Sequence, residues 1–317
     1  MSSSETNTVF WMLESLTPWD IHAHGITKVI LQKKTPYQEL TIVETGAYGK
    51  TLVLDGVWQS SVKDEFLYHE PLVQPAMIYH GNPRKVLIIG GGEGATAREV
   101  LRWKTVERVV MVELDQEVAE TCREYLPEMH TGAFADPRLE LVIDDARNFL
   151  NTTSQEWDVV ISDLSDPDEE GTTSTLFTTE YFSQIRRVLK PNGIFATYAG
   201  SIEFSVNLPL SAQIVRTINA VFPYVLPYSS YVPSLGEAIA FVVASVEEIT
   251  PQLDPAVVTQ LLEAKTTGNL RMLDGGSLMG LMQVPLYIRQ EIASETKVYT
   301  LEEPPKWQRL SRITSQR

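Results

Sequence analysis

The residues most able to do chemistry form the acidic turn DLSDP at residues 163–167, directly after the apolar run at residues 157–162. Asp163 and Asp166 are three positions apart, so their carboxylates can face one cleft. One carboxylate could accept the proton that an ammonium must lose before its nitrogen attacks, while the other holds a distal ammonium. A loop of solvated acids that ends in a proline is the alternative. The turn therefore predicts either an amine-binding cleft or an exposed loop.

A second candidate site is the glycine turn GGGEGA at residues 90–95, which follows the apolar run at residues 85–89. Glycines such as Gly90 and Gly92 let a backbone turn sharply and approach a ligand closely. The string also satisfies the dinucleotide pattern G-x-G-x-x-A, so a nicotinamide enzyme is a competing interpretation. Glu93 favours the other one, because its carboxylate would repel a pyrophosphate but hold a cationic amine. We therefore expect this turn to bind an adenosyl amine.

Four further acids line or support the same predicted pocket. Glu113 ends the next apolar run, about twenty residues beyond the glycine turn, where an acid accepts hydrogen bonds from ribose hydroxyls. Asp115 is expected to support the turn or cap the following helix. Asp144 and Asp145 end a third apolar run, where a carboxylate can accept a hydrogen bond from an adenine amino group; one of them is expected to cap the helix that starts at Ala146. Both AdoMet and NAD enzymes use such a nucleoside pocket.

Hydrophobic periodicity indicates the elements that position these residues. Short strand-like runs over residues 26–61 predict a small antiparallel β-domain, preceded by a loose leader at residues 1–15. Apolar strands that alternate with helical stretches predict an α/β fold with a Rossmann-like, doubly wound parallel sheet, covered by helices on both faces. The predicted domains are an N-terminal β-domain with its leader at residues 1–63 and a Rossmann-like domain with a helical C-terminal edge at residues 64–317.

Charge narrows the classes of partner. The 317 residues include 41 Asp and Glu but only 26 Lys and Arg, which gives a net charge of −15. Such a protein repels phosphate backbones, so nucleic acid is not expected as a partner, whereas a cationic substrate would be attracted. The alternative is that the charge only keeps the protein soluble.

Other chemistry is not indicated. The single cysteine, Cys122, forms no internal disulfide and no zinc cluster, and His22 and His24 lack a clustered third ligand, so no metal site is expected. No secretory signal and no apolar stretch of about 20 residues is found. These absences predict a cytoplasmic protein without a membrane segment.

The motifs together resemble those of the spermidine synthases, the polyamine aminopropyltransferases. GGGEG, Glu113, Asp145 and DLSDP occur in that family's order, and upstream the strings YQ at residues 37–38, LDGVWQ at residues 54–59 and DEFLYHE at residues 64–70 match as well. The similarity covers roughly residues 25–245. It implies transfer of the aminopropyl group of decarboxylated S-adenosylmethionine to putrescine or a related amine. The products would be spermidine, or an analogue of it, and methylthioadenosine, with no metal or other cofactor.

The resemblance also implies roles for matched residues. Asp163 would be the base that acts on the attacking amine, and Tyr68 would orient that nitrogen. The acceptor amine would be bound by Asp166, Tyr231 and Gln59. The donor would be bound by Gln38, His69, Gly90, Gly92, Glu93, Glu113, Asp144, Asp145 and Asp163. Without the motif, His69 would be interpreted as an ordinary polar helix residue. The family also suggests a homodimer or homotetramer and a gate at residues 167–178.

Three departures from the commonest family pattern concern the substrates. Glu93 replaces an aspartate, DEEG at residues 168–171 replaces a glycine-proline turn, and YVPSL at residues 231–235 replaces a Tyr-Pro-Ser segment. The strings GGGEGATAREV, YHEPLVQPAM and the VPS segment look more like the thermospermine synthase and agmatine-using branch, so agmatine or spermidine is an alternative acceptor. An ordinary AdoMet methyltransferase and a non-catalytic polyamine-binding protein are the competing functions from other classes.

Overall fold

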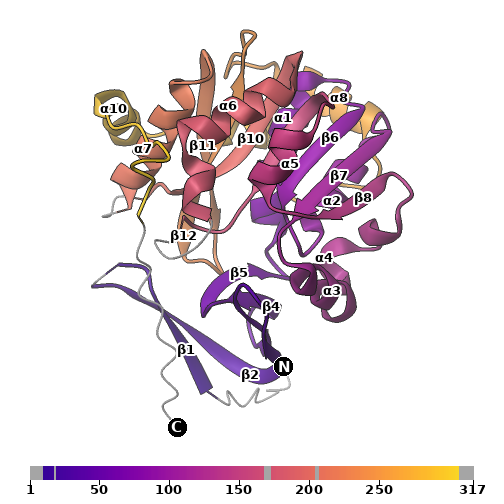
Figure 1. The fold of residues 1–317 in the computed structure, drawn as a ribbon, viewed down its shortest axis with the longest axis vertical. Coiled ribbons are helices and arrows are strands. Elements are labelled where there is room, and N and C mark those ends of the chain that lie inside the picture. Colours follow the sequence, from indigo (N-terminus) through magenta and orange to yellow (C-terminus); the bar gives the residue numbers. More distant parts are fainter. Residues whose placement is uncertain (1–9, 18, 168–172, 204–206, 307–317) are drawn as a thin grey trace.

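The computed structural model describes residues 10–17, 19–167, 173–203 and 207–306 (Figure 1). The N-terminal part is an antiparallel sheet whose strands follow one another in chain order. Its strands are β1 (Phe10–Ser15), β2 (Ile21–Lys34), β3 (Glu39–Thr45), β4 (Gly49–Leu54) and β5 (Val57–Ser61). This sheet lies below the larger domain in Figure 1 and faces the ends of its strands.

The expected leader is wrong for its last residues, because β1 pairs with β2 along its whole length. The sequence pattern does not predict β1, because apolar and polar residues do not alternate between its inward and outward faces. Met12 and Glu14 are both buried, with 3% and 1% of their surface exposed, whereas Trp11, which precedes Met12, is 51% exposed. An inward glutamate and an outward tryptophan invert the usual strand pattern.

The second sheet has the order β11-β12-β10-β9-β6-β7-β8. Its strands are β6 (Lys85–Gly90), β7 (Arg108–Glu113), β8 (Leu139–Ile143), β9 (Trp157–Asp163), β10 (Leu189–Ser201), β11 (Tyr224–Val232) and β12 (Glu237–Ser245). The neighbouring strands β10, β9, β6, β7 and β8 are parallel, as predicted. In contrast, β12 is antiparallel to both β10 and β11. The sheet is therefore mixed, because the short turn between β11 and β12 permits only a hairpin.

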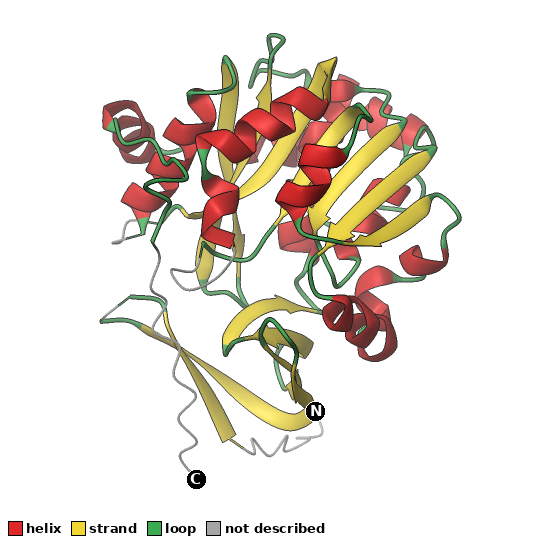
Figure 2. Ribbon diagram, in the orientation of Figure 1, coloured by secondary structure: helices red, strands yellow, loops and turns green. Residues whose placement is uncertain are grey.

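Helices cover both faces of this sheet (Figure 2). They are α1 (Phe66–His80), α2 (Ala95–Leu101), α3 (Gln116–Tyr125), α4 (Pro127–His130), α5 (Ala146–Thr152), α6 (Thr179–Val188), α7 (Leu208–Asn219), α8 (Pro255–Lys265), α9 (Gly275–Leu281) and α10 (Leu286–Ser294). No helix in the described ranges combines the length and the apolar character that crossing a bilayer requires.

The sheet order brings the two candidate motifs together. From β6 the chain runs outward through β7 and β8, and then returns to the other side of β6 as β9. Ligands of doubly wound sheets bind at such a reversal, outside the carboxyl ends of the strands. Here Gly90 at the end of β6 pairs in register with Asp163 at the end of β9. The glycine turn and the acidic turn therefore start side by side.

Helix α1 extends from Phe66 to His80 although it contains two prolines, Pro71 and Pro75. Pro75 has no N–H to donate to the carbonyl of Pro71, one turn earlier. The hydroxyl of Tyr228 on β11 donates to that carbonyl instead, at 2.8 Å. Because Tyr228 is fully buried, a tertiary contact replaces the missing helical hydrogen bond.

Tyr228→Phe should therefore lower the free energy of unfolding by about 1–3 kcal/mol, because it leaves a buried carbonyl without a donor. Urea denaturation followed by circular dichroism, at one protein concentration, measures the change. Tyr224→Phe on the same strand is the control: Tyr224 is 38% exposed, so a change within about 0.5 kcal/mol is expected. Equal effects of the two substitutions would contradict this account of α1.

Candidate active site

The carboxyl ends of the parallel strands open into a cavity of about 400 Å³, which the β-domain closes from the other side. Seven carboxylates line it: Asp55, Glu93, Glu113, Asp144, Asp145, Asp163 and Asp166. Among the described lining residues there is no lysine, arginine or histidine. A concave site lined by charges of one sign attracts the opposite sign strongly. The cavity is therefore built for a cationic ligand.

Two glycines of the turn are required by close packing. Gly90 has φ +79°, and a Cβ there would lie 2.2 Å from the carbonyl oxygen of Asp163. A Cβ on Gly92 would lie 2.9 Å from Glu113 Oε2. Only glycine lets the turn after β6 approach both acids, so these residues shape the cavity as predicted for a ligand-binding turn.

Asp163 lies at the centre of the cavity and is held by two donors. The Thr96 hydroxyl donates to Oδ2 at 2.6 Å, and the Tyr68 hydroxyl donates to Oδ1 at 3.1 Å. Burial, together with the negative charge of Glu93, raises the pKa of Asp163 to about 6, although His69, Thr96 and Tyr68 oppose the shift. A carboxyl with a pKa near the working pH is well suited to accept a proton and release it again.

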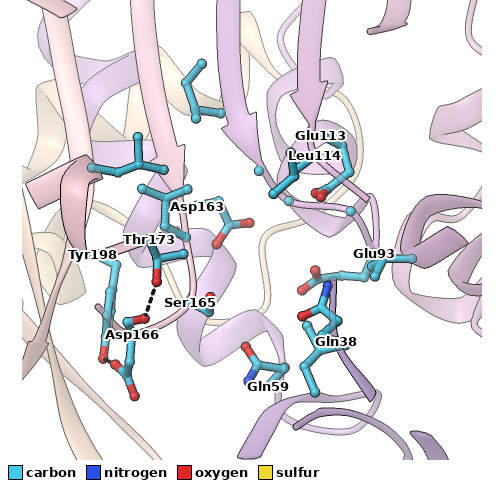
Figure 3. A pocket seen from close by; sticks show the side chains of 18 of the residues that line it. Gln38, Gln59, Glu93, Glu113, Leu114, Asp163, Ser165, Asp166, Thr173 and Tyr198 are labelled. Atoms are coloured by element: carbon cyan, nitrogen blue, oxygen red, sulfur yellow. Dashed lines mark hydrogen bonds between the residues drawn. The ribbon is translucent and has the colours of Figure 1, made fainter. Parts of the chain in front are cut away.

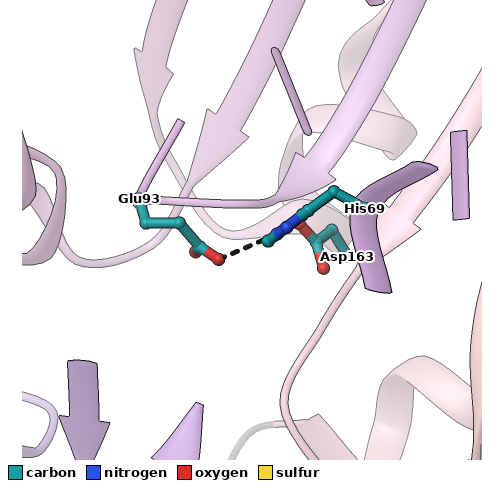
Figure 4. Close-up of side chains that lie close together, drawn as sticks. All are labelled: His69, Glu93 and Asp163. Atoms are coloured by element: carbon teal, nitrogen blue, oxygen red, sulfur yellow. Dashed lines mark hydrogen bonds and ion pairs between the residues drawn. The ribbon is translucent and has the colours of Figure 1, made fainter. Parts of the chain in front are cut away.

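Glu93 is fixed by a histidine behind it (Figure 4). His69 Nε2 lies 3.0 Å from Glu93 Oε1, and His69 Nδ1 lies 3.0 Å from Glu65 Oε2. Burial favours neutral forms, but the two carboxylates outweigh it and raise the pKa of His69 to about 10. The hydrogen bond and charge of His69 in turn outweigh burial of Glu93 and keep its pKa below the usual range.

The family resemblance implies that His69 binds the donor, but the structure places His69 behind Glu93, outside the cavity. Its side chain is completely buried, and it is not among the residues that line the cavity. Atoms of His69, Glu93 and Asp163 lie within 4.8 Å of one another, which is close enough to surround a cation. However, Nε2 of His69 faces Glu93, and the pKa of His69 of about 10 favours a proton on this nitrogen over a metal ion. An organic cation at Glu93 and Asp163 fits these groups better.

The other end of the cavity has the features of a nucleoside pocket. Burial raises the pKa of Glu113 to about 7, and one of its oxygens accepts a hydrogen bond from the Asp115 backbone. Asp115 caps α3, as expected, and also accepts a hydrogen bond from Gln38 Nε2 at 3.1 Å. Asp145 caps α5, which confirms that one of the two adjacent acids has this role. Asp144 accepts hydrogen bonds from the Asn148 side chain.

The opposite end contains Asp166 and Gln59, which both line the cavity. The Tyr198 hydroxyl donates to Asp166 Oδ1, and the Thr173 hydroxyl donates to the carbonyl of Asp166 at 2.8 Å. Tyr231 does not belong to this site: it is 55% exposed and points to the opposite face of β11 from buried Val232. The acids of DEEG at residues 168–171 lie outside the described residues.

Sequence reasoning missed several residues that shape the cavity. Tyr198 follows Thr197, which pairs with Ser162 of β9, so it emerges beside Asp163 at the same sheet edge. The rule that strand ends carry the site could have found it. Thr96 and Ser60 gave no such signal, because an alcohol in a helix or a strand is common. Only tertiary packing brings the Ser60 hydroxyl to 3.2 Å from Glu93 Oε1.

Figure 3 shows how these groups divide the cavity. Glu93, Glu113 and Gln38 lie on one side, Asp166 and Tyr198 lie on the other, and Asp163 lies between them. This arrangement can hold a nucleoside with a cationic arm on one side and an amine on the other. The central carboxylate can then take a proton from the amine.

Two family models match the chain in order. Residues 10–61 match the spermidine synthase tetramerisation domain, and residues 65–254 match the spermine/spermidine synthase domain. The chain belongs to the spermidine synthase family. It is 50% identical over 310 residues to a polyamine aminopropyltransferase from a Synechococcus strain, covering 96% of this chain and 99% of that protein. A polyamine aminopropyltransferase from Aeropyrum pernix is 43% identical over 314 residues, covering 95% and 98% respectively.

Solved structures agree with the family's fold. A spermidine synthase in complex with the transition-state analogue AdoDATO superimposes with a TM-score of 0.83 at 30% identity, covering 90% of this chain and 96% of the other. The spermidine synthase from Thermotoga maritima gives a TM-score of 0.81 at 30% identity, covering 90% and 94%. The chain is therefore a polyamine aminopropyltransferase, and neither an ordinary methyltransferase nor a non-catalytic binding protein.

Asp163→Asn should reduce turnover by about 10²–10⁴-fold, because an amide cannot accept the proton. The same substitution should change the pH dependence of stability. A folded-state pKa of about 6 means that stability present below the unfolded pKa is lost as the pH rises through 6. Wild type should therefore lose about 1 kcal/mol relative to the variant between pH 5 and pH 8.

Thermal unfolding of both proteins at the two pH values measures this difference. Asp55→Asn is the control, since it removes another cavity carboxylate but leaves Asp163 ionisable, so it should keep the wild-type pH dependence at that site. If the difference in stability between wild type and Asp163→Asn is the same at pH 5 and pH 8, then the pKa of Asp163 is not near 6. Near-normal turnover of Asp163→Asn would show that another group is the base.

Proposed function

We propose that decarboxylated S-adenosylmethionine is the donor, with its adenosine at Glu113, Gln38 and the pair Asp144 and Asp145. Its ammonium binds Glu93, and the acceptor lies between Asp163 and Asp166. The observation that carries this proposal is the wall of seven carboxylates without a cationic side chain among the described lining residues. Intact S-adenosylmethionine brings a carboxylate beside its amine, which Glu93 would repel. The decarboxylated donor brings only the ammonium.

The reaction requires positioning and one proton transfer. The acceptor nitrogen attacks the methylene carbon next to the sulfonium, a C–N bond forms, and the C–S bond breaks. The electron pair of that bond goes to sulfur, which becomes the neutral thioether of methylthioadenosine. Asp163 takes the proton of the attacking amine and passes it to solvent, while Tyr68 holds the Asp163 carboxylate in line. The sulfonium is already a good leaving group, so we predict that no metal is needed.

We infer that the preferred acceptor is longer than putrescine, with agmatine and spermidine as the candidates. Asp166 is the anchor for the distal cation, and its carboxylate is oriented by the Tyr198 hydroxyl. The strings GGGEGATAREV and YHEPLVQPAM and the VPS segment within residues 231–235 also favour the thermospermine and agmatine-using branch over putrescine users. Putrescine, with the shortest span between its nitrogens, is the competing acceptor.

A panel of separate acceptors, analysed by mass spectrometry, tests the proposal. With decarboxylated S-adenosylmethionine as donor, we expect aminopropyl products from agmatine or spermidine at higher kcat/KM than from putrescine or cadaverine. Asp166→Asn should raise the KM for the acceptor about tenfold or more, because hydrogen bonds to charged groups are strong. By far the highest efficiency with putrescine would overturn the acceptor, and methyl transfer from S-adenosylmethionine would overturn the donor.

We also propose that the chain assembles into a homotetramer through the β-domain, and that it works in the cytoplasm. The matched tetramerisation family supports the assembly. So does the outer face of the first two strands, where Trp11 and Ile21 are 51% and 63% exposed. Neighbouring apolar side chains exposed in this way mark interaction surfaces.

The double variant Trp11→Glu with Ile21→Glu should shift the mass measured by light scattering from a tetramer to a smaller species, because charge is then buried at the interface. Val257→Glu is the matched control: Val257 is 60% exposed but lies on α8, away from the β-domain, so assembly should persist. A monomeric wild-type protein would rule out the proposed assembly.

A further inference from the structure

We propose that Glu65 and Arg98 are positioning residues for the donor, although neither lines the cavity. They hold His69 as an imidazolium, and the imidazolium fixes the Glu93 carboxylate where the donor's ammonium binds. This inference rests on the proposed donor and adds residues that the family motifs did not assign a role.

The contacts form one continuous chain of groups behind the cavity wall. Glu93 Oε1 lies 3.0 Å from His69 Nε2, whose other nitrogen lies 3.0 Å from Glu65 Oε2. The same oxygen of Glu65 accepts a hydrogen bond from Arg98 Nη2 at 2.7 Å. Arg98 Nε lies 2.9 Å from Glu99 Oε1. The signs of the charges therefore alternate from the cavity inward.

The residues of this series of contacts come from separate elements, so only the tertiary structure brings them together. Glu65 is the residue that precedes α1, His69 is one turn further on, and Arg98 and Glu99 belong to α2. Arg98 also donates to the backbone of α4 at the Met129 carbonyl. Glu99 is fully buried and accepts a hydrogen bond from Gln74 at 3.1 Å, so the far end of the chain is anchored.

The charged and titratable groups that face His69 come from each of the elements packed around its side chain. They are Glu65 and Tyr68 from the start of α1, Glu93 from the turn after β6, Asp163 from the end of β9 and, through Glu65, Arg98 from α2. His69 lies between Glu65 and Glu93 and contacts both carboxylates, and Arg98 contacts Glu65. Arg98 compensates the charge of Glu65 from the other side, which keeps that carboxylate ionised.

The charges on His69 and Glu65 depend on each other. Burial opposes the charge on His69, and the hydrogen bond that His69 donates to Glu65 is the largest effect that favours it. Burial also opposes the charge on Glu65, but His69 and Arg98 lower the pKa of Glu65 to about 2. If His69 were neutral, Glu93 and Asp163 would repel each other in a buried site, and a proton would occupy the place of the donor's ammonium.

Comparison of two ligands separates this role from a merely structural one. Decarboxylated S-adenosylmethionine carries the cationic arm, whereas methylthioadenosine has the same nucleoside without it. Isothermal titration calorimetry of each ligand, in the absence of acceptor, measures the ratio of their affinities. For Glu65→Gln we expect the donor to lose affinity about tenfold or more, while methylthioadenosine changes by less than about threefold.

The affinity ratio should also become sensitive to pH. In wild type the ratio should be nearly flat between pH 7 and pH 9, because the pKa of His69 is about 10. In Glu65→Gln the imidazolium loses its main partner, so its pKa falls and the ratio should decline over this range. In kinetics, the KM for the donor should rise more than kcat falls. Glu65→Asp, which keeps the charge, should restore part of the loss.

Glu140→Gln is the matched control, because it breaks an Arg–Glu pair with the same 2.7 Å separation at the protein surface. It should leave both affinities and their pH dependence unchanged. Equal weakening of both ligands in Glu65→Gln, or a ratio that stays flat with pH, would overturn the inference. If Glu65→Gln does not fold, Arg98→Lys provides the same test, since a lysine cannot contact Glu65, Glu99 and Met129 together.

The result also separates this inference from the proposed donor. If wild-type enzyme does not bind decarboxylated S-adenosylmethionine more tightly than methylthioadenosine, then the donor assignment fails and this inference fails with it. If wild type shows that preference and Glu65→Gln keeps it at every pH, then only the role of Glu65 and Arg98 is wrong.

Discussion

The ion pair between His69 and Glu93 is the interaction on which this active site depends. Acidic side chains crowd the carboxyl ends of the central strands, and buried carboxylates repel one another and resist ionisation. One imidazolium behind the wall keeps Glu93 charged without placing a cation inside the cavity. The substrates can then supply the missing positive charge themselves. The ionic chain through Glu65 and Arg98 extends the same principle into the core, where each charge is compensated by the next.

This charge arrangement has a cost that the fold tolerates. Burial raises the pKa of Asp163 to about 6 and that of Glu113 to about 7, so both acids destabilise the empty protein when they ionise. A bound cation would lower both pKa values and thereby remove this destabilisation. The free energy recovered in this way would contribute to binding. The same carboxylates that weaken the folded state would therefore favour the proposed doubly cationic donor and an ammonium-bearing acceptor, as expected where stability is traded for function.

Backbone geometry makes the crowding possible. Gly90 and Gly92 allow the turn after β6 to pack against the backbone of Asp163 and the side chain of Glu113. The reversal of strand order at β6 and β9 then sets the proposed donor and acceptor halves of the cavity next to each other. The β-domain closes the cavity with Trp58 and Gln59, so the two domains share one site.

The sequence by itself determined the class of fold, the family and the acids at the strand ends. Apolar runs and glycine turns are local features, and the rule that ligands bind at strand ends is general. It did not reveal β1, the antiparallel edge of the sheet, the buried position of His69 or the exposed position of Tyr231. Those depend on which face of an element meets its neighbours, and contacts such as Ser60 with Glu93 or Arg98 with Glu65 join residues about thirty positions apart. Only the tertiary structure decided which charges neutralise one another and which remain for the substrates.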